Sequence, residues 1–369
     1  WDGYRLSWQL EGLVFEIIGS KPPGVHGPPP DFESGNIPRF AASRNALREI
    51  RTISDASHPS PAPQTPAPPD IYLNGRMVPA AEASVSVADA GFQHAVGLFE
   101  TFQVHQGRPF RLQQHLDRLA GSARELGLAD EFQTAPLAEA VQKTIEHNGL
   151  VRARMRLTLT AGTLSMLNTS PDGQPEIEVQ RTVAIVPSEP TAYAPEYFTQ
   201  GITALIHGPA ASPFDDNAGH KTLNYWSRLR SLRRAAAAGA GEAIWLNVTN
   251  HLASGAVSNL LLVKDGKLFT PFARGEEVPE ALRAPVLPGV TRAAVIELAH
   301  QGNIEVVRKM LTVEDLLEAD EVMLTNSGWG VLPVTKVEQR EIADGKVGPM
   351  SMSLREGLNQ LFVDETAGA

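Results

Sequence analysis

The sequence predicts an α+β protein with two domains, preceded by a proline-rich segment without regular structure. Strand-like and helix-like apolar patterns alternate from Ile71 onward, which is typical of mixed domains. The proline run Pro59–Pro69 precedes them and favours an extended or disordered chain. A second stretch with prolines, Pro187–Pro195, separates two sets of elements. The predicted parts are a disordered extension (1–70), a small N-terminal α+β domain (71–187), an interdomain linker (188–195), a larger C-terminal domain (196–358) and a tail (359–369).

Composition excludes several classes of function. The chain has 369 residues and a formal net charge of −10, so it lacks the basic surface that nucleic acid or anionic lipid requires. No apolar run reaches the roughly 18 residues of a membrane-spanning helix. The absence of cysteine excludes disulfides, thiolate metal sites and a cysteine nucleophile. We therefore expect a cytoplasmic protein without nucleic-acid, membrane or metal partners.

Turn residues and apolar spacing mark the elements of the small domain. Asn74-Gly75 indicates a hairpin within 71–79, and Gln106-Gly107 closes a second strand pair within 84–110. Further elements are helices at 111–128 and 136–149 and strands at 151–162 and 176–186. In the first of these strands, Arg152, Arg154 and Arg156 share one face.

The larger domain shows the same mixture of patterns. Asp265-Gly266 between apolar runs indicates a hairpin, and a Pro-Gly entry with a glycine exit delimits a helix at 287–302. The other predicted elements are strands at 202–208, 242–248, 304–311, 321–328 and 331–337, and helices at 225–238 and 313–319.

The stretch GHKTLNYW, with Lys221 near its centre, is the first candidate for chemistry. It follows a loop-like segment and leads into the predicted helix at 225–238. Most lysines are solvated surface residues. The alternative is an amine nucleophile whose pKa is lowered by partial burial, so that it can form a Schiff base.

Three further motifs can bind an anion. In LPGVTR, a glycine before a helix exposes the N–H groups of Val290 and Thr291, although it can equally be an ordinary helix entry. TNSGWG places Ser327 at a strand end, where a simple turn is the alternative. In HLDRL, Arg118 is either solvated or a guanidinium that reaches a phosphate.

The ordered set of these motifs resembles the class IV aminotransferases. The set runs DAGFQHAVGLFET, RPFRLQQHLDRL, HKTLNYW, LASGAVSNLLLVKDGKLFTP, LPGVTR and EADEVMLTNS, and it covers roughly residues 71 to 358. The family contains branched-chain aminotransferases, D-amino-acid aminotransferases and aminodeoxychorismate lyase. The resemblance implies a two-domain α+β fold with pyridoxal 5′-phosphate (PLP) between the domains, and a homodimer.

The resemblance also implies roles for individual residues. Lys221 matches the Schiff-base lysine, which also shuttles the substrate proton. Tyr225 lies near a tyrosine that sits beside the cofactor in branched-chain enzymes, although the spacing K-T-L-N is closer to the D-amino-acid and lyase branches. Phe99 falls where the family has a substrate-pocket aromatic. The implied phosphate contacts are Arg118, Val290, Thr291 and Ser327.

Two positions depart from the family pattern. Ser254 stands where the family usually has a glutamate that protonates the pyridine nitrogen, and a hydroxyl carries no charge to favour that proton. This predicts slower transamination and favours elimination chemistry. Ala161-Gly162 stands where D-amino-acid enzymes have an arginine, which disfavours strict D-specificity. Arg154 or Arg156 can replace it in the substrate pocket if they face inward; solvated strand arginines are the alternative.

We therefore predict a PLP-dependent aminotransferase that acts on a small or branched-chain amino acid and a 2-oxo acid. The first alternative is an aminodeoxychorismate-type lyase, which gives 4-aminobenzoate and pyruvate by elimination. The second is a PLP-binding protein whose catalysis is weakened or lost because of Ser254.

Overall fold

The computed structural model describes residues 3–10, 13–20, 68–129, 131–163, 181–208 and 210–367, and the chain divides into two units at Ala67/Pro68. The first unit contains an antiparallel hairpin of β1 (Gly3–Leu10) and β2 (Leu13–Ser20). This differs from the sequence expectation, which gave residues 1–70 no regular structure. The prolines from Pro59 to Pro66 lie outside the described residues.

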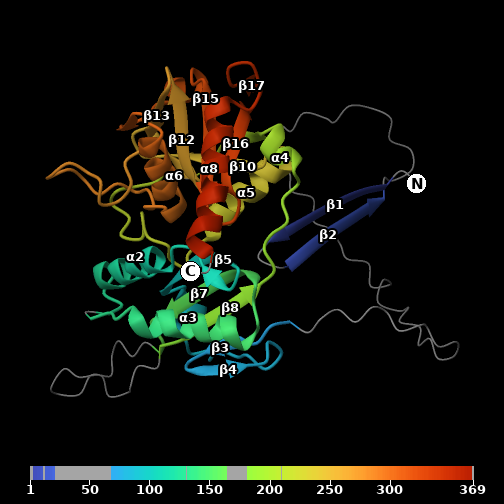
Figure 1. Ribbon diagram of the computed structural model, residues 1–369, viewed down its shortest axis with the longest axis vertical. Helices are drawn as coiled ribbons and strands as arrows, with labels where there is room; N and C mark the ends of the chain where they lie inside the picture. Colours follow the sequence, from blue (N-terminus) through green and yellow to red (C-terminus); the bar gives the residue numbers. More distant parts are fainter. Residues whose placement is uncertain are drawn as a thin grey trace, which may run out of the picture. The chain divides into compact units, whose positions relative to one another are not determined.

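The second unit begins with a six-stranded antiparallel sheet in the order β4-β3-β8-β7-β5-β6. Its strands are β3 (Ile71–Leu73), β4 (Arg76–Val78), β5 (Gly97–His105), β6 (Arg108–Pro109), β7 (Arg152–Thr160) and β8 (Val183–Ser188). Helices α2 (Leu112–Glu125) and α3 (Ala135–His147) cover one face (Figure 1). Between them lies a core that includes Phe102, Leu116 and Met155, all fully buried.

Local turn chemistry explains both predicted hairpins of this sheet. Asn74 and Gly75 have φ of 46° and 90° and connect β3 to β4. Gln106 and Gly107 have φ of 51° and 76° and connect β5 to β6. Such left-handed pairs match the twist of two-residue hairpin turns. A short helix, α1 (Ala90–His94), capped by the Asp89 side chain, occupies part of the region predicted as a strand pair.

The larger sheet has nine strands, with the path β11-β10-β9-β16-β15-β12-β13-β14 and β17 beside β16. Its strands are β9 (Ile202–Ile206), β10 (Glu242–Leu246), β11 (Leu252–Gly255), β12 (Asn259–Lys264), β13 (Lys267–Thr270), β14 (Val306–Arg308), β15 (Glu321–Asn326), β16 (Gly330–Val337) and β17 (Arg340–Glu341). Long aliphatic side chains such as Leu260, Leu261 and Leu262 are buried from both faces. The sheet therefore has packing on each side.

Five helices accompany this sheet: α4 (Glu196–Thr199), α5 (Trp226–Ala237), α6 (Val290–Gln301), α7 (Val313–Leu317) and α8 (Pro349–Thr366). Helix α8 runs along the sheet (Figure 1), and its Leu354 and Leu358 join the core of α6 and β12. The segment predicted as a tail, 359–369, is helical as far as Thr366, because α8 continues into it.

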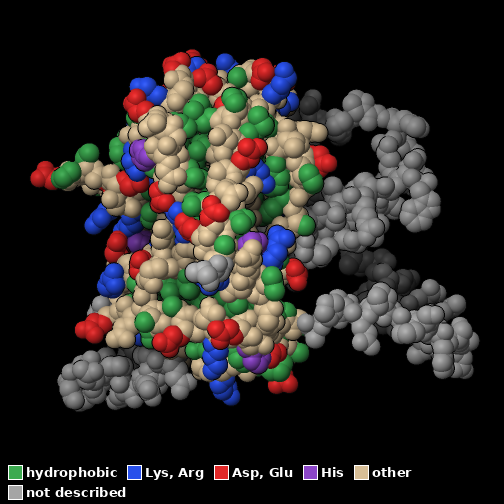
Figure 2. Space-filling model, in the orientation of Figure 1, with side chains coloured by type: hydrophobic (Ala, Val, Ile, Leu, Met, Phe, Trp, Pro, Cys, Tyr) green, Lys and Arg blue, Asp and Glu red, His purple; other side chains and the backbone are tan. Residues whose placement is uncertain are grey.

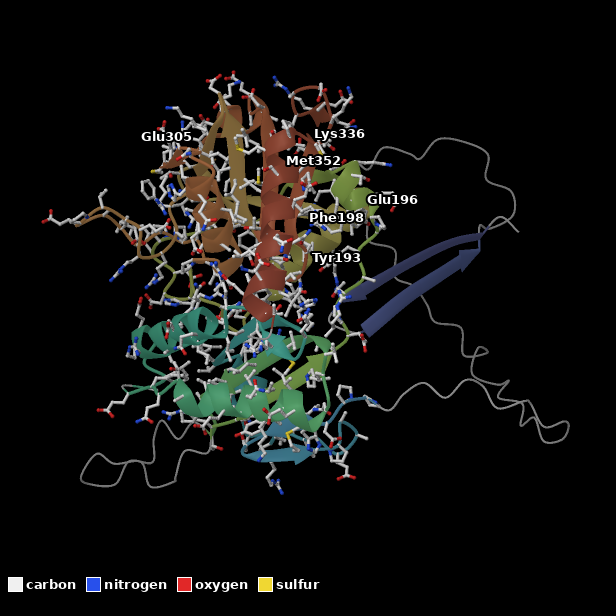
Figure 3. All side chains as sticks on the ribbon, in the orientation of Figure 1. Tyr193, Glu196, Phe198, Glu305, Lys336 and Met352 are labelled. Carbon is white, nitrogen blue, oxygen red and sulfur yellow. The ribbon has the colours of Figure 1, made fainter. Side chains whose placement is uncertain are left out.

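The two sheets are connected around Lys221. The Phe99 N–H donates to the Lys221 carbonyl (2.9 Å), the Leu223 N–H donates to the Gly97 carbonyl (2.9 Å), and Leu98 forms a bridge with Thr222. The segment after β8 also joins the halves, and its Tyr193 packs edge-on against Phe198 and Trp329 (Figure 3). The fold is thus α+β with two sheets, as predicted.

Charged side chains of both signs lie on the surface of the described residues. On the face shown in Figure 2, acidic and basic side chains are interspersed rather than gathered into one basic patch. No helix among the described residues is long and apolar enough to cross a membrane. Within the same residues, no group of three or more His, Cys, Asp or Glu side chains could hold a metal ion.

Candidate active site

Lys221 lies in an aromatic corner between the two sheets. Its Nζ is 4.3 Å from the centroid of the Phe99 ring and donates to the Tyr225 hydroxyl at 3.3 Å. The two rings meet edge-on with centroids 5.0 Å apart. The lysine is half-buried, with its amine against two aromatic rings rather than fully exposed on the surface.

The Tyr225 phenol lies in a positive environment. Burial acts to raise its pKa, yet the cations of Lys221 and Arg228 outweigh burial and lower the pKa below its ordinary value. The phenol therefore stabilises negative charge more readily than a free tyrosine. A group of this kind suits contact with Lys221 while a proton is transferred.

The entry of α6 lies beside the turn after β15. Val290 and Thr291 are the first residues of α6, and the Thr291 Oγ lies 3.4 Å from the Ser327 Oγ. That separation is too long for a strong hydroxyl–hydroxyl bond, so both hydroxyls can donate to a shared anion. The N–H groups in the first turn of the helix have no carbonyl partner within the helix, so they can also donate to an anion.

Gly289, the residue before α6, is required by the close approach of Asn259. A Cβ at Gly289 would lie 1.9 Å from the Asn259 Oδ1. The Asn259 amide nitrogen donates to the Leu287 carbonyl at 2.8 Å and so fixes the loop that enters the helix. Packing against Asn259 therefore requires a glycine at position 289, in addition to the exposure of N–H groups that the sequence suggested.

Arg118 of α2 reaches the same helix entry. Its Nη1 donates to the Pro288 carbonyl at 2.8 Å. Its Nε and Nη2 donate to the two carboxylate oxygens of Glu100 at 2.8 and 2.5 Å. These bonds use three of the five N–H groups of the guanidinium, which leaves donors for an anion. Arg118 is therefore neither solvated nor mobile in orientation.

Glu100 and His115 form the buried support of this arginine, and the sequence analysis did not identify either. The His115 Nδ1 lies 2.8 Å from the Glu100 carboxylate, and both side chains are about 1% exposed. Burial acts to raise the pKa of Glu100, but Arg118 and His115 lower it to about 2. Burial lowers the pKa of His115, so it is neutral at pH 7 and can donate its Nδ1 hydrogen. One sequence signal could have identified Glu100: it is a charged residue in the apolar strand pattern GLFETF, at a position that alternation assigns to the buried face.

Ser254 is buried in β11, directly across from Trp245 of β10. Beside this pair lies Arg228 of α5, whose Nη1 donates to the Ala256 carbonyl at 2.8 Å. Its guanidinium lies 5.0 Å from the Trp245 ring centroid. The neighbourhood of Ser254 thus contains a cation that the sequence gave no reason to select.

Arg154 and Arg156 of β7 lie on the same face of the sheet as Phe99, whereas Arg152 at the start of the strand is exposed. Thr101 pairs with Arg156 and Gln103 with Arg154 across β5 and β7, so these side chains share one face with Phe99. The Arg156 guanidinium lies 3.8 Å above the Phe99 ring, and both arginines are half-buried. The inward-facing alternative is the one that the structure supports.

Two amide side chains tie the turn after β15 to its surroundings, and the sequence analysis passed over both. The Gln103 amide donates to the carbonyls of Ser327 and Gly328, each at 2.8 Å. The Asn326 Oδ1 accepts from the N–H groups of Gly328 and Trp329 at 2.8 and 3.0 Å. The turn that carries Ser327 is therefore held from both halves of the molecule.

Lys221 thus lies where the six-stranded antiparallel sheet and the larger mixed sheet are connected, and Arg118, Thr291 and Ser327 lie around the entry of α6. The family model described as amino-transferase class IV matches residues 97–337. A putative branched-chain-amino-acid aminotransferase from Methanocaldococcus jannaschii is 32% identical over 288 residues, which cover 78% of this chain and 94% of that protein. The chain belongs to the class IV aminotransferases.

Solved structures agree with this membership. The Escherichia coli branched-chain amino acid aminotransferase superposes with a TM-score of 0.71 at 30% identity, covering 81% of this chain and 96% of that one. The 4-amino-4-deoxychorismate lyase from Pseudomonas aeruginosa has a TM-score of 0.66 at 28% identity, with coverages of 79% and 98%. Another branched-chain amino acid aminotransferase, solved with pyridoxamine 5′-phosphate, has a TM-score of 0.69 at 27% identity, with coverages of 80% and 95%.

Proposed function

We propose that the chain is a PLP-dependent aminotransferase that moves an amino group between a small or branched-chain amino acid and a 2-oxo acid, with Lys221 as its Schiff-base residue. The observation that carries the proposal is the placement of the Lys221 amine against Phe99 and Tyr225, where the two sheets are connected. Family membership supports the reaction class. Bound PLP supplies the carbonyl carbon for the lysine and the ring that accepts electron density from the substrate Cα.

The remaining functions are phosphate binding, proton transfer and exclusion of water, and each is assigned to residues of this chain. The N–H groups of Val290 and Thr291, the two hydroxyls of Thr291 and Ser327, and the Arg118 guanidinium would hold the phosphate. The Lys221 amine, once released by substrate, would take the Cα proton and return it, while Tyr225 accepts a hydrogen bond from that amine. Phe99 closes the site over the lysine and limits the access of water.

The substrate carboxylate would bind on the arginine face of β7. Arg156 lies over Phe99, closer to Lys221 than its neighbour Arg154. We therefore assign Arg156 the direct contact with the carboxylate, whereas Arg154 contributes charge from the next position on the same face. Phe99 and Thr101 lie beside these arginines and would contact the substrate side chain.

The test is the visible spectrum of the protein with PLP, before and after borohydride reduction and before and after a panel of amino acids. We expect a yellow Schiff-base band that borohydride fixes and that selected amino acids bleach. Lys221→Ala removes the band. Lys264→Ala, which changes an exposed lysine paired with Asp320, is the matched control and keeps it. A parent protein without the band refutes the cofactor and, with it, the role proposed for each residue of the site.

Ser254 is the observation that favours a second candidate, an aminodeoxychorismate-type lyase. It is buried and uncharged, so the site lacks the carboxylate that would favour a protonated ring. Release of 4-aminobenzoate and pyruvate from 4-amino-4-deoxychorismate, without bleaching by any amino acid, would replace the aminotransferase assignment. A band that responds to neither substrate leaves the binding-only alternative.

Two further parts of the proposal concern organisation. We propose that PLP lies between a domain of residues 71–187 and one of residues 196–358, joined by residues 188–195. We also propose that the chain forms a homodimer, which sedimentation velocity of the PLP-loaded protein tests directly. A sedimenting species of monomer mass at micromolar concentration would contradict the homodimer.

A further inference from the structure

Arg228 is a cation beside the lysine that the proposed function does not use. It is the third residue of α5, and it is half-buried. Its Nη1 donates to the carbonyls of Ala256 (2.8 Å) and Gly255 (3.5 Å). Among the described residues, no carboxylate forms an ion pair with it. A partly buried guanidinium held only by carbonyls keeps its full positive charge in the site.

Strand register places Ser254 next to Trp245, the ring that Arg228 lies against. Ser254 pairs with Trp245 across β10 and β11, so the two side chains lie on the same face. The Arg228 guanidinium lies 5.0 Å from the Trp245 ring and 5.7 Å from the Tyr225 ring. It therefore lies between the residue that neighbours Lys221 and the residue that neighbours Ser254.

Glu242 is the buried carboxylate closest in sequence to Trp245 and Ser254, and it does not neutralise the charge of Arg228. Glu242 belongs to β10, but its side chain is on the face opposite Trp245. Its oxygens accept from the N–H groups of Ala243, Ala256 and Val257 and from the Ser258 hydroxyl. The charged groups that face Tyr225 are Lys221, Arg228 and Arg118, all of them cations.

We propose that Arg228 and Ser254 together hold the ring nitrogen of the cofactor unprotonated. Ser254 offers a hydroxyl hydrogen to the nitrogen lone pair, and Arg228 makes a positive charge on that nitrogen unfavourable. The proposal rests on the proposed function. Arg228 is a positioning residue in this proposal, since it acts through the field at the ring and not by contact with the substrate.

The experiment uses PLP labelled with ¹⁵N in the ring, bound to the full chain, with the ¹⁵N NMR shift recorded from pH 6 to pH 9. We expect the shift of a neutral pyridine throughout. In Arg228→Gln the nitrogen binds a proton at least about tenfold more readily, because one nearby like charge is removed. In Ser254→Glu the nitrogen is protonated near pH 7. Arg228→Lys keeps the charge and the neutral shift.

Arg230→Gln is the matched control, since Arg230 is an exposed arginine on the same helix and the same change there leaves the shift unaltered. A parent protein that binds PLP with a protonated ring nitrogen overturns this inference and leaves the proposed function intact. A parent protein that forms no borohydride-fixed adduct overturns both. If Arg228→Gln and Arg230→Gln change the ¹⁵N shift equally, Arg228 has no specific role at the ring nitrogen.

Discussion

Replacement of Glu100 by glutamine tests the buried support of Arg118. In the native protein, Glu100 is about 1% exposed and accepts from Arg118 and His115. Its pKa is lowered from 4.5 to about 2, a difference that corresponds to about 3 kcal/mol of stability at neutral pH. The sign follows from the depressed pKa: this stability is present above pH 4.5 and is lost as the pH falls toward 2.

The variant Glu100→Gln also leaves the Arg118 guanidinium without its anionic partner. Breaking a buried pair by removing one member costs roughly 3–5 kcal/mol. We expect the free energy of unfolding at pH 7, measured by urea titration, to fall by about that amount. We also expect the variant to lose less stability than the parent when the pH is lowered from 5 to 3. PLP affinity falls at least about tenfold, since Arg118 is no longer held at the helix entry.

The matched control is Glu125→Gln, which removes a carboxylate at the end of α2. Glu125 pairs with Arg274 at 2.8 Å, but its side chain is 44% exposed, so the cost is within about 1 kcal/mol. The reasoning is refuted if Glu100→Gln and Glu125→Gln unfold at the same urea concentration at pH 7. Equal PLP affinity in parent and Glu100→Gln would separately refute the connection to PLP binding.

Three other substitutions test the surrounding structure. In Glu242→Gln, stability changes less with pH than in the parent. Burial raises the pKa of Glu242 to about 7, so the parent loses stability as the pH rises from 4.5 through 7, and urea titrations at pH 5.5 and 8.5 measure about 2 kcal/mol of that loss. Gly289→Ala places a Cβ against the Asn259 Oδ1, costs about 1–3 kcal/mol and weakens PLP binding, and a thermal melt that matches the parent contradicts this. Gln103→Ala removes both bonds to the turn at Ser327 and raises the Kd for PLP several-fold in a fluorescence titration, whereas an unchanged Kd shows that Asn326 alone holds the turn.

Local sequence patterns were sufficient where neighbouring residues determine the structure. The Asn74-Gly75 and Asp265-Gly266 turns were predicted because the left-handed backbone they need is a property of those residues. Val290 and Thr291 were placed at a helix entry because the Pro-Gly pair before them is a local start signal. Helix α8 was missed although Met350, Leu354 and Leu358 recur at helical spacing, so in that case the signal was present in the sequence.

Long-range partners could not be predicted in the same way. The bond from Arg118 to Pro288 spans 170 positions, and that from Gln103 to Ser327 spans 224. Arg228 meets the Ser254 strand only because α5 packs where β10 and β11 pair in one particular register. Such contacts depend on the assembled fold, and no spacing within the chain encodes them.

Strand β5 shows why the fold and the site constrain each other. Its even-numbered residues Leu98, Phe102 and Val104 are buried in the core under α2 and α3, and Glu100 on that face holds Arg118. Its odd-numbered residues face the site: Phe99 lies over Lys221, and Gln103 bonds the turn at Ser327. A slip of one residue would exchange the two faces, placing Phe99 against α2 and Glu100 toward the lysine. The alternation that buries the core under α2 and α3 therefore also sets the positions of Phe99 and of the turn at Ser327.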